Sequence, residues 1–200
     1  MWSPPLRWAP HNMDLFQNKY FHLYNRSNNR EIVFKERKNY MFFLKKYRQY
    51  LNKDVTTLSY CLMPTHFHFL IYVRSKETEL IKKNIGILLS SYTKAINKAF
   101  SRTGSLFQNH TKTKLITDER YLLTLTNYIH QNPLRTGLVK EIINWEFSSY
   151  RDYIGKRKGT LINKSIIMKR FNSIDEFILF SSQKIEKLNF LHDNDVESTS

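Results

Sequence analysis

The chain has 200 residues, of which 32 are Lys or Arg and 17 are Asp or Glu, so its formal net charge is +15. A hydrophobic content of 41% suits a folded domain with a buried core, and so basic a balance favours a polyanionic partner, nucleic acid first. The single cysteine, Cys61, excludes an internal disulfide, and no apolar run reaches the roughly 18 residues of a membrane span. We expect a cytoplasmic protein that makes no contact with membranes.

The charge is unevenly distributed along the chain. Residues 172–200 hold two lysines and six acids, which leaves 30 basic and 11 acidic side chains to the rest. The segment before the first predicted strand, 1–18, is expected to be a disordered extension. A basic break at 156–158 begins an expected appendage over 156–200 with a helix and an acidic tail, which leaves a main domain over 19–155. Met13 is a second candidate for the start of translation, beside Met1.

Hydrophobic periodicity predicts the first secondary-structure elements. Alternating aromatic residues over 19–24 predict a strand that leads into a polar turn. Apolar residues at helical spacing over 37–51 predict an amphipathic helix with a basic outer face. Residues 55–63 and 66–73 have the pattern of two strands, and Pro64 between them removes a ladder donor and favours a tight reversal.

The second half begins with a long predicted helix over 77–100, followed by a glycine-containing loop and a short strand over 112–116. A further helix is expected to begin near Thr117 as its N-cap. It is expected to end near Asn132, because Pro133 disfavours helical geometry in the residue before it.

Weaker patterns follow, with a short segment over 147–154 and a tail helix from 174 to about 188. Strands and helices therefore follow one another in the order β-α-β-β-α-β. This order predicts the α+β class, with a ferredoxin-like (RRM-like) sandwich built on a central antiparallel sheet.

Two histidines stand one residue apart in the predicted strand, at His66 and His68. Side chains at i and i+2 of a strand point to the same face, so the two imidazoles have the spacing of a metal site, although chelating spacing also occurs by chance. Tyr128 and Asn132 lie four residues apart on the predicted third helix and hence on one face. If that helix crosses the sheet beside the histidines, two imidazoles and an amide oxygen can hold a divalent ion, Mg²⁺ or Mn²⁺.

Several segments in order also carry a family resemblance. The chain resembles the IS200-like, single-tyrosine transposases of the HUH superfamily, and within them the REP-associated tyrosine transposases. The resemblance spans about residues 19–155. Its motifs are YFHLYNR at 20–26, YCLMPTHFH at 60–68, RTGSLFQ at 102–108, YIHQNPLR at 128–135 and WEFSSYR at 145–151.

The resemblance implies a ferredoxin-like fold with the histidine pair on a strand and the nucleophilic tyrosine on a helix. Carried over by position, it implies that Tyr128 is catalytic and that His66, His68 and Asn132 bind the metal. The implied activity is metal-dependent cleavage and rejoining of single-stranded DNA at hairpins formed by palindromic repeats, through a 5′-phosphotyrosine intermediate.

The chain departs from the family pattern at Thr65, where asparagine is more frequent, and at Phe107, where tryptophan is common. Neither departure removes an implied catalytic group. Basic residues in or beside the matched segments are candidates for phosphate contact. They are Arg26, Arg30, Lys94, Arg102, Lys112, Lys114 and Arg135.

The other histidines are expected to have no catalytic or metal-binding role. His22 and His110 lack a partner at ligand spacing and are expected to be ordinary polar residues, while His130 lies about 200° around the helix from Tyr128 and is expected to be structural or DNA-facing. Two rival functions stay open, a domesticated DNA-binding regulator that does not cleave and a metal-dependent hydrolase that uses water. The sequence is compatible with a monomer or with a homodimer that exchanges its tyrosine helix.

Overall fold

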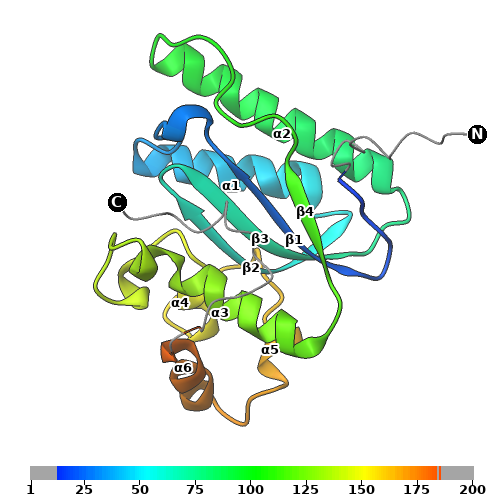
Figure 1. Cartoon of the computed structure of the whole chain (residues 1–200), viewed down its shortest axis with the longest axis vertical. Coiled ribbons are helices and arrows are strands. Elements are labelled where there is room, and N and C mark those ends of the chain that lie inside the picture. Colours follow the sequence, from blue (N-terminus) through cyan, green and yellow to red (C-terminus); the bar gives the residue numbers. More distant parts are fainter. Residues whose placement is uncertain (1–12, 184, 186–200) are drawn as a thin grey trace, which may run out of the picture.

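The computed structural model of the chain describes residues 13–183 and 185. Within this part, four strands form one antiparallel sheet in the order β2-β3-β1-β4 (Figure 1). They are β1 (Tyr20–Arg26), β2 (Val55–Met63), β3 (His66–Val73) and β4 (Lys112–Ile116). The two long strands predicted on either side of Pro64 and Thr65 are thus confirmed with their bounds.

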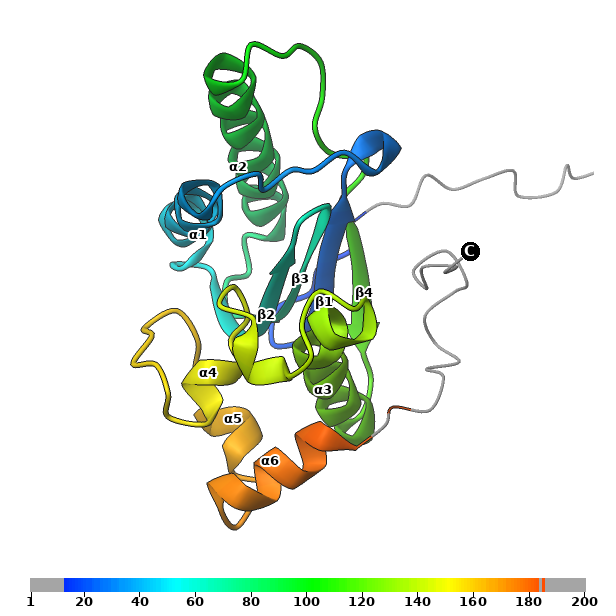
Figure 2. The same cartoon turned by 90° about the vertical axis from the view of Figure 1, so that its left-hand side faces the viewer.

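Helices cover both faces of the sheet (Figures 1 and 2). α1 (Arg37–Leu51) and α2 (Thr78–Ala99) pack together on one face, and α3 (Glu119–Arg135) lies across the other. The elements up to β4 follow the order β-α-β-β-α-β, and the inner strands are β3 and β1. The predicted ferredoxin-like sandwich is confirmed, with α3 as an added layer.

Short elements complete the molecule, mostly on the α3 side of the sheet (Figure 2). They are η1 (Asn28–Arg30), η2 (Ile142–Asn144), α4 (Tyr150–Tyr153), α5 (Ser165–Met168) and α6 (Ile174–Ser182). No helix in the described part of the chain is long and apolar enough to cross a membrane.

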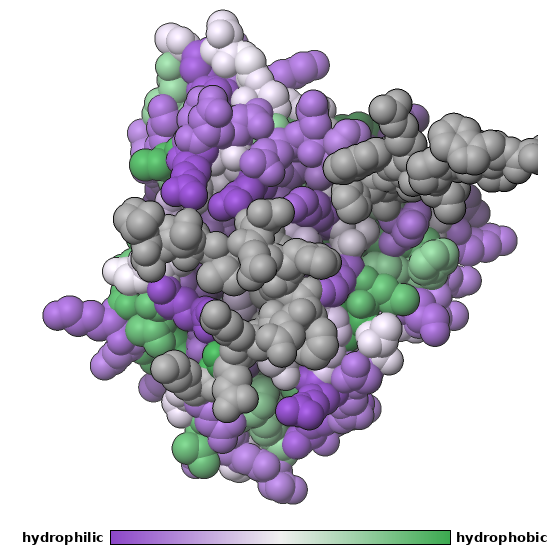
Figure 3. All heavy atoms as spheres, in the orientation of Figure 1, coloured by the Kyte–Doolittle hydropathy of each residue, from purple (hydrophilic) through white to green (hydrophobic). Residues whose placement is uncertain are grey.

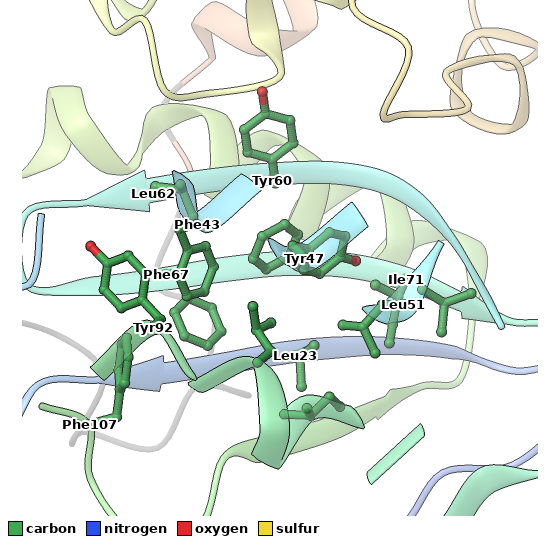
Figure 4. Packing of buried hydrophobic residues seen from close by; sticks show 14 of the residues in the cluster. Leu23, Phe43, Tyr47, Leu51, Tyr60, Leu62, Phe67, Ile71, Tyr92 and Phe107 are labelled. Atoms are coloured by element: carbon green, nitrogen blue, oxygen red, sulfur yellow. The ribbon is translucent and has the colours of Figure 1, made fainter. Parts of the chain in front are cut away.

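The sheet separates two hydrophobic clusters, and strand alternation decides which residues enter each. Phe67 and Phe69 of β3 pack under α1, where the ring of Tyr47 stacks on Phe69 at 4.0 Å between centroids and Phe43 is fully buried (Figure 4). Leu70 belongs to the cluster on the opposite face, under α3. Because neighbouring side chains alternate, the even-numbered residues at the start of β3 also face α3.

Several predicted boundaries differ from the structure. The first strand continues to Arg26, so the expected turn begins two residues later. The N-cap of α3 is Asp118 rather than Thr117, since the Asp118 carboxylate accepts from the Tyr121 backbone N–H at 2.8 Å. The prediction that this helix ends near Asn132 is wrong: α3 continues to Arg135, because the burial of Asn132 and Pro133 outweighs the loss of the hydrogen bond that proline cannot donate.

The two terminal segments are packed where the structure describes them. Residues 1–12 of the expected extension lie outside the described range, but Leu15 is 4% exposed and the Asn18 backbone N–H donates to the Val73 carbonyl at 2.8 Å. Residues 13–18 therefore pack against the sheet and are not a free extension, because the side chain of Leu15 enters the core. The expected tail helix ends at Ser182, and the acidic tail lies beyond the described residues.

α6 is joined to α3 by side chains of α3 that reach its carbonyl end. Asn127 donates to the Phe180 carbonyl at 3.0 Å, and Gln131 donates to the Ser181 carbonyl at 2.7 Å. Phe177 of α6 is fully buried in the cluster under α3. The described part of the 156–200 appendage thus shares a core with the main domain.

His130 lies on the buried face of α3 and has a structural role. Its Nε2 lies 2.8 Å from Ser149 Oγ, which in turn accepts from the Tyr60 backbone N–H at 2.9 Å. The imidazole thus links α3 to strand β2. Burial lowers the pKa of His130 to about 3, because desolvation disfavours the imidazolium.

We expect His130 to make the fold sensitive to acid. Histidine in an unfolded chain titrates near 6.5, so between that pH and about 3 the unfolded state binds the extra proton. The free energy of unfolding should fall as the pH drops below 6.5, by roughly 3 kcal/mol at pH 4.5 from this side chain. Urea unfolding at pH 7, 6 and 5 should show a flatter dependence for His130→Gln, whose amide can still reach Ser149.

The control for this prediction is His110→Gln, since His110 is exposed. This variant should keep the pH dependence of the parent. An equal slope in the parent and in His130→Gln would contradict the assignment. Burial also lowers the pKa of His22 to about 3, so part of the acid sensitivity should persist in the variant.

Candidate active site

The histidine pair stands at the start of β3, on the sheet face that α3 covers. The rings of His66 and His68 have centroids 5.0 Å apart and lie nearly perpendicular to each other. His68 is 5% exposed, whereas His66 is half-buried at the edge of the same face. The alternation predicted from the sequence therefore brings both imidazoles to one place.

α3 brings the other two predicted residues to this place. The ring centroid of Tyr128 lies 5.7 Å from that of His68, and Asn132 Oδ1 lies 3.4 Å from His66 Nε2. Both residues are buried on the helix. The helix continues past Asn132, so the i+4 relation holds and the two side chains lie one turn apart.

The inner nitrogen of each imidazole is held by another side chain. Thr65 Oγ1 lies 3.0 Å from His66 Nδ1, and His22 Nε2 lies 2.9 Å from His68 Nδ1. Both histidines can therefore offer Nε2 to a ligand. The departure from the family pattern at Thr65 keeps a hydrogen-bonding group next to His66.

Electrostatics favours neutral imidazoles at this site. Burial lowers the pKa of His66 to about 4, although the hydrogen bond that its Nε2 donates to Asn132 Oδ1 opposes the shift. Burial also holds the pKa of His68 well below its ordinary value, and the nearby His66, His22 and Arg26 act in the same direction. A metal ion binds the neutral form, so the site needs no deprotonation at neutral pH.

The donor set fits a small divalent ion. Adjacent ligands of an octahedral ion, each at about 2.1 Å, lie about 3 Å apart, and the His66 to Asn132 distance of 3.4 Å is close to this. No cluster of three or more His, Cys, Asp or Glu side chains in the described part of the chain suits a metal ion. The protein ligands would thus be two imidazoles and one amide, with room for oxygen ligands from water or substrate.

Four of the predicted DNA-binding residues surround this site. Arg26 of β1 stands opposite His66 of the neighbouring strand β3. On the edge strand β4, Lys112 stands opposite Tyr24 and Lys114 opposite His22, so both lysines lie on the face of the histidines. The Arg135 guanidinium lies 5.6 Å from the ring centroid of Tyr128. These residues form a basic rim, defined here as Arg26, Lys112, Lys114 and Arg135.

The other three predicted DNA-binding residues lie away from this rim. Lys94 is exposed on α2, across the sheet from α3, where hydrophilic side chains cover much of the surface visible in Figure 3. Arg102 forms an ion pair with Glu31 at 2.8 Å. Arg30 is exposed in η1, the turn after β1. Their positions do not place them with the histidine pair.

His22 is the site residue that sequence reasoning missed. It was expected to be an ordinary polar residue, but it is fully buried and contacts His68. The spacing rule considered only residues near one another in sequence, whereas His22 meets His68 because β1 and β3 are neighbouring strands. The available signal was the alternation of the first strand, which puts His22 on the same face as Tyr24.

Comparisons with known proteins bear on the family resemblance and on the fold. The chain is 24% identical over 103 residues to a candidate REP-associated tyrosine transposase of Haemophilus influenzae. The matched segment covers 47% of this chain and 58% of that protein. Its fold matches the structure of a REP-associated tyrosine transposase bound to a REP hairpin, with a TM-score of 0.55 and 15% identity. The resemblance to REP-associated tyrosine transposases is thereby confirmed.

The extent of each match differs. The chain spans less than two thirds of the length of the Haemophilus influenzae transposase. The structural match covers 79% of this chain and 96% of the hairpin-bound transposase. No family model matches the chain. The structural likeness supports the shared fold, and the matched segment of the Haemophilus influenzae protein supports the relationship in sequence.

Proposed function

We propose that this chain is a metal-dependent DNA transposase or endonuclease that cleaves and rejoins single strands at hairpin sites through a phosphotyrosine intermediate. The observation that carries the proposal is the meeting of four side chains at one place. Tyr128 lies beside His68, and Asn132 lies beside His66. A phenol next to a three-donor site can combine a nucleophile with Lewis-acid stabilisation of a phosphate in one place.

In the proposed reaction the Tyr128 oxygen attacks the phosphorus of a phosphodiester. A bond forms between this oxygen and phosphorus, the bond from phosphorus to the 3′ oxygen breaks, and the phenol proton passes to solvent. The 3′ oxygen takes up a proton and leaves as a hydroxyl, and the 5′ phosphate stays on the tyrosine. The linkage conserves the phosphodiester energy, so attack by another 3′-hydroxyl rejoins the strand.

His66, His68 and Asn132 would hold the divalent ion, Mg²⁺ or Mn²⁺. When bound, it would supply Lewis-acid stabilisation for the charge that develops on the phosphate oxygens. The side chains of the site would hold their donor atoms toward one point, and burial would exclude competing water. Arg135, over the Tyr128 ring, would add a positive charge where the phosphate must lie.

Hairpin DNA is the proposed substrate for two reasons. The structural relative is described in complex with a REP hairpin. A strand that must present its phosphate to a buried tyrosine also needs the flexibility of unpaired nucleotides, which the flank of a hairpin provides. We propose that the basic rim contacts the phosphates on either side of the scissile position.

Incubation of the protein with labelled single-stranded hairpin DNA and Mn²⁺ tests the function. We expect a covalent protein–DNA adduct that survives denaturing electrophoresis, with the DNA attached to the peptide that contains Tyr128. Cleavage without an adduct would favour a hydrolase that uses water. Tight hairpin binding with neither cleavage nor adduct would favour a non-cleaving regulator, and either result would overturn the proposal.

The basic rim yields a prediction about binding. The double variant Lys112→Ala with Lys114→Ala should bind a single-stranded hairpin flank more weakly. Its dependence of log K on log salt should be shallower by about 1.4, since each phosphate contact on a single strand contributes about 0.7. Fluorescence anisotropy at several salt concentrations measures both quantities.

A matched pair of lysines on α2 serves as the control for the basic rim. Lys94 and Lys98 are exposed there, across the sheet from α3. Replacing both with alanine removes the same charge from the chain. If this variant lowered the salt dependence as much as the Lys112 and Lys114 variant does, net charge rather than the rim would explain binding.

A further inference from the structure

His22 occupies a position on β1 that no motif assigns to the chemistry. Its side chain is fully buried, its ring stacks on Tyr24 at 4.5 Å between centroids, and its Nε2 lies 2.9 Å from His68 Nδ1. β1 and β3 are hydrogen-bonded neighbours at the centre of the sheet. The strands therefore hold the two imidazoles together without support from a loop.

The hydrogen bond between the two imidazoles restricts where His68 can carry its proton. One nitrogen must donate and the other accept. If His68 donates from Nδ1, its Nε2 keeps a free lone pair for a ligand. If His22 donates instead, His68 carries its proton on Nε2 and cannot bind an ion there. The first state is the only one of the two that suits the proposed site.

This arrangement has a cost for the folded protein. His22 Nδ1 is buried and has no hydrogen-bond partner among the described residues, in either tautomer. A buried polar atom without a partner ordinarily destabilises a protein, and an apolar ring would fill the same space without this cost. His130 Nδ1 is unpartnered in the same way, so what distinguishes His22 is its contact with His68.

We propose that His22 is a positioning residue for the metal site. Its Nε2 accepts a hydrogen bond from the Nδ1–H of His68 and so keeps His68 Nε2 unprotonated and aimed at the ion. This inference rests on the proposed function, because it assumes that His68 is a ligand. The role is that of an outer hydrogen-bond partner, which ordinarily changes metal affinity by about 10- to 100-fold.

Mn²⁺ binding by the DNA-free protein, measured by calorimetry, tests the role of His22. His22→Phe keeps a ring of similar size but cannot accept a hydrogen bond. His22→Gln carries an amide oxygen that can accept one from His68 Nδ1–H. We expect the Kd for Mn²⁺ to rise at least about 10-fold in His22→Phe and to return to within about 3-fold of the parent in His22→Gln.

His130→Phe is the matched control, because His130 is also fully buried but is bonded to Ser149. It should leave the Mn²⁺ affinity unchanged even if it lowers the stability measured by urea unfolding. Equal Mn²⁺ affinity in the parent, His22→Phe and His22→Gln would overturn the inference and leave the proposed function intact. A parent that binds no Mn²⁺ would overturn both the inference and the proposed metal site.

Should His22→Phe fail to fold, His22→Gln and His22→Leu decide the matter by the same comparison. A folded His22→Leu with the parent's Mn²⁺ affinity would also overturn the inference. Circular dichroism and the urea midpoint report the fold independently of the metal. A loss of affinity that is restored by glutamine but not by leucine cannot arise from packing alone.

Discussion

Replacing Tyr128 with phenylalanine is expected to lower covalent adduct formation on hairpin DNA by about 10³-fold or more. Loss of a catalytic nucleophile ordinarily costs this much, because water or another side chain is a poor substitute in the same place. The change removes one oxygen and keeps the ring that packs beside His68 at 5.7 Å. Denaturing gels of reactions with labelled DNA and Mn²⁺ measure the effect directly.

Tyr72→Phe is the matched control for this experiment. Tyr72 lies on the same strand as the histidines, and its hydroxyl donates to Asn18 Oδ1 at 3.1 Å, away from the site. Both variants lose one hydroxyl, so a general effect of tyrosine removal would appear in both. Adduct formation by Tyr128→Phe at the parent's rate would show that a different group attacks the phosphate.

Replacing His66 with alanine is expected to lower Mn²⁺-dependent cleavage by more than about 100-fold at limiting Mn²⁺. The variant loses a donor atom that lies 3.4 Å from Asn132 Oδ1, and loss of even an outer hydrogen-bond partner costs about 10- to 100-fold. Because the other two donors remain, high Mn²⁺ should restore part of the activity. Initial rates measured over a range of Mn²⁺ concentrations separate this loss of affinity from a loss of fold.

Asn132→Asp supplies the companion variant for the metal site. A carboxylate is a stronger ligand than an amide for a hard divalent ion, so its Mn²⁺ requirement should shift to lower concentrations while that of His66→Ala shifts to higher ones. Asn132→Ala should resemble His66→Ala. If His66→Ala and Asn132→Asp showed the parent's Mn²⁺ dependence, the metal would bind elsewhere.

Much of the fold followed from local patterns. The alternation in β2 and β3 and the helical spacing in α1 and α2 predicted these elements with bounds close to those observed. Such patterns are reliable because burial on one side of an element repeats with the period of its backbone. The ferredoxin-like topology then followed from the order of the elements.

The end of α3 shows where local rules fail. Proline disfavours helical geometry in the preceding residue, yet α3 runs through Pro133 to Arg135. Packing against the sheet outweighs this local preference, since Asn132 and Pro133 are both buried. Tertiary contacts here decide the outcome, and they also place Asn132 beside His66.

The sequence by itself determined which residues share a face, because the periods of strand and helix are properties of the backbone. It thereby paired His66 with His68 and Tyr128 with Asn132. Only the tertiary structure decided that these two pairs meet, that His22 reaches His68 across neighbouring strands, and that the basic rim excludes Lys94. Contacts between distant segments depend on strand order and packing, and the spacing of residues along a chain carries no record of them.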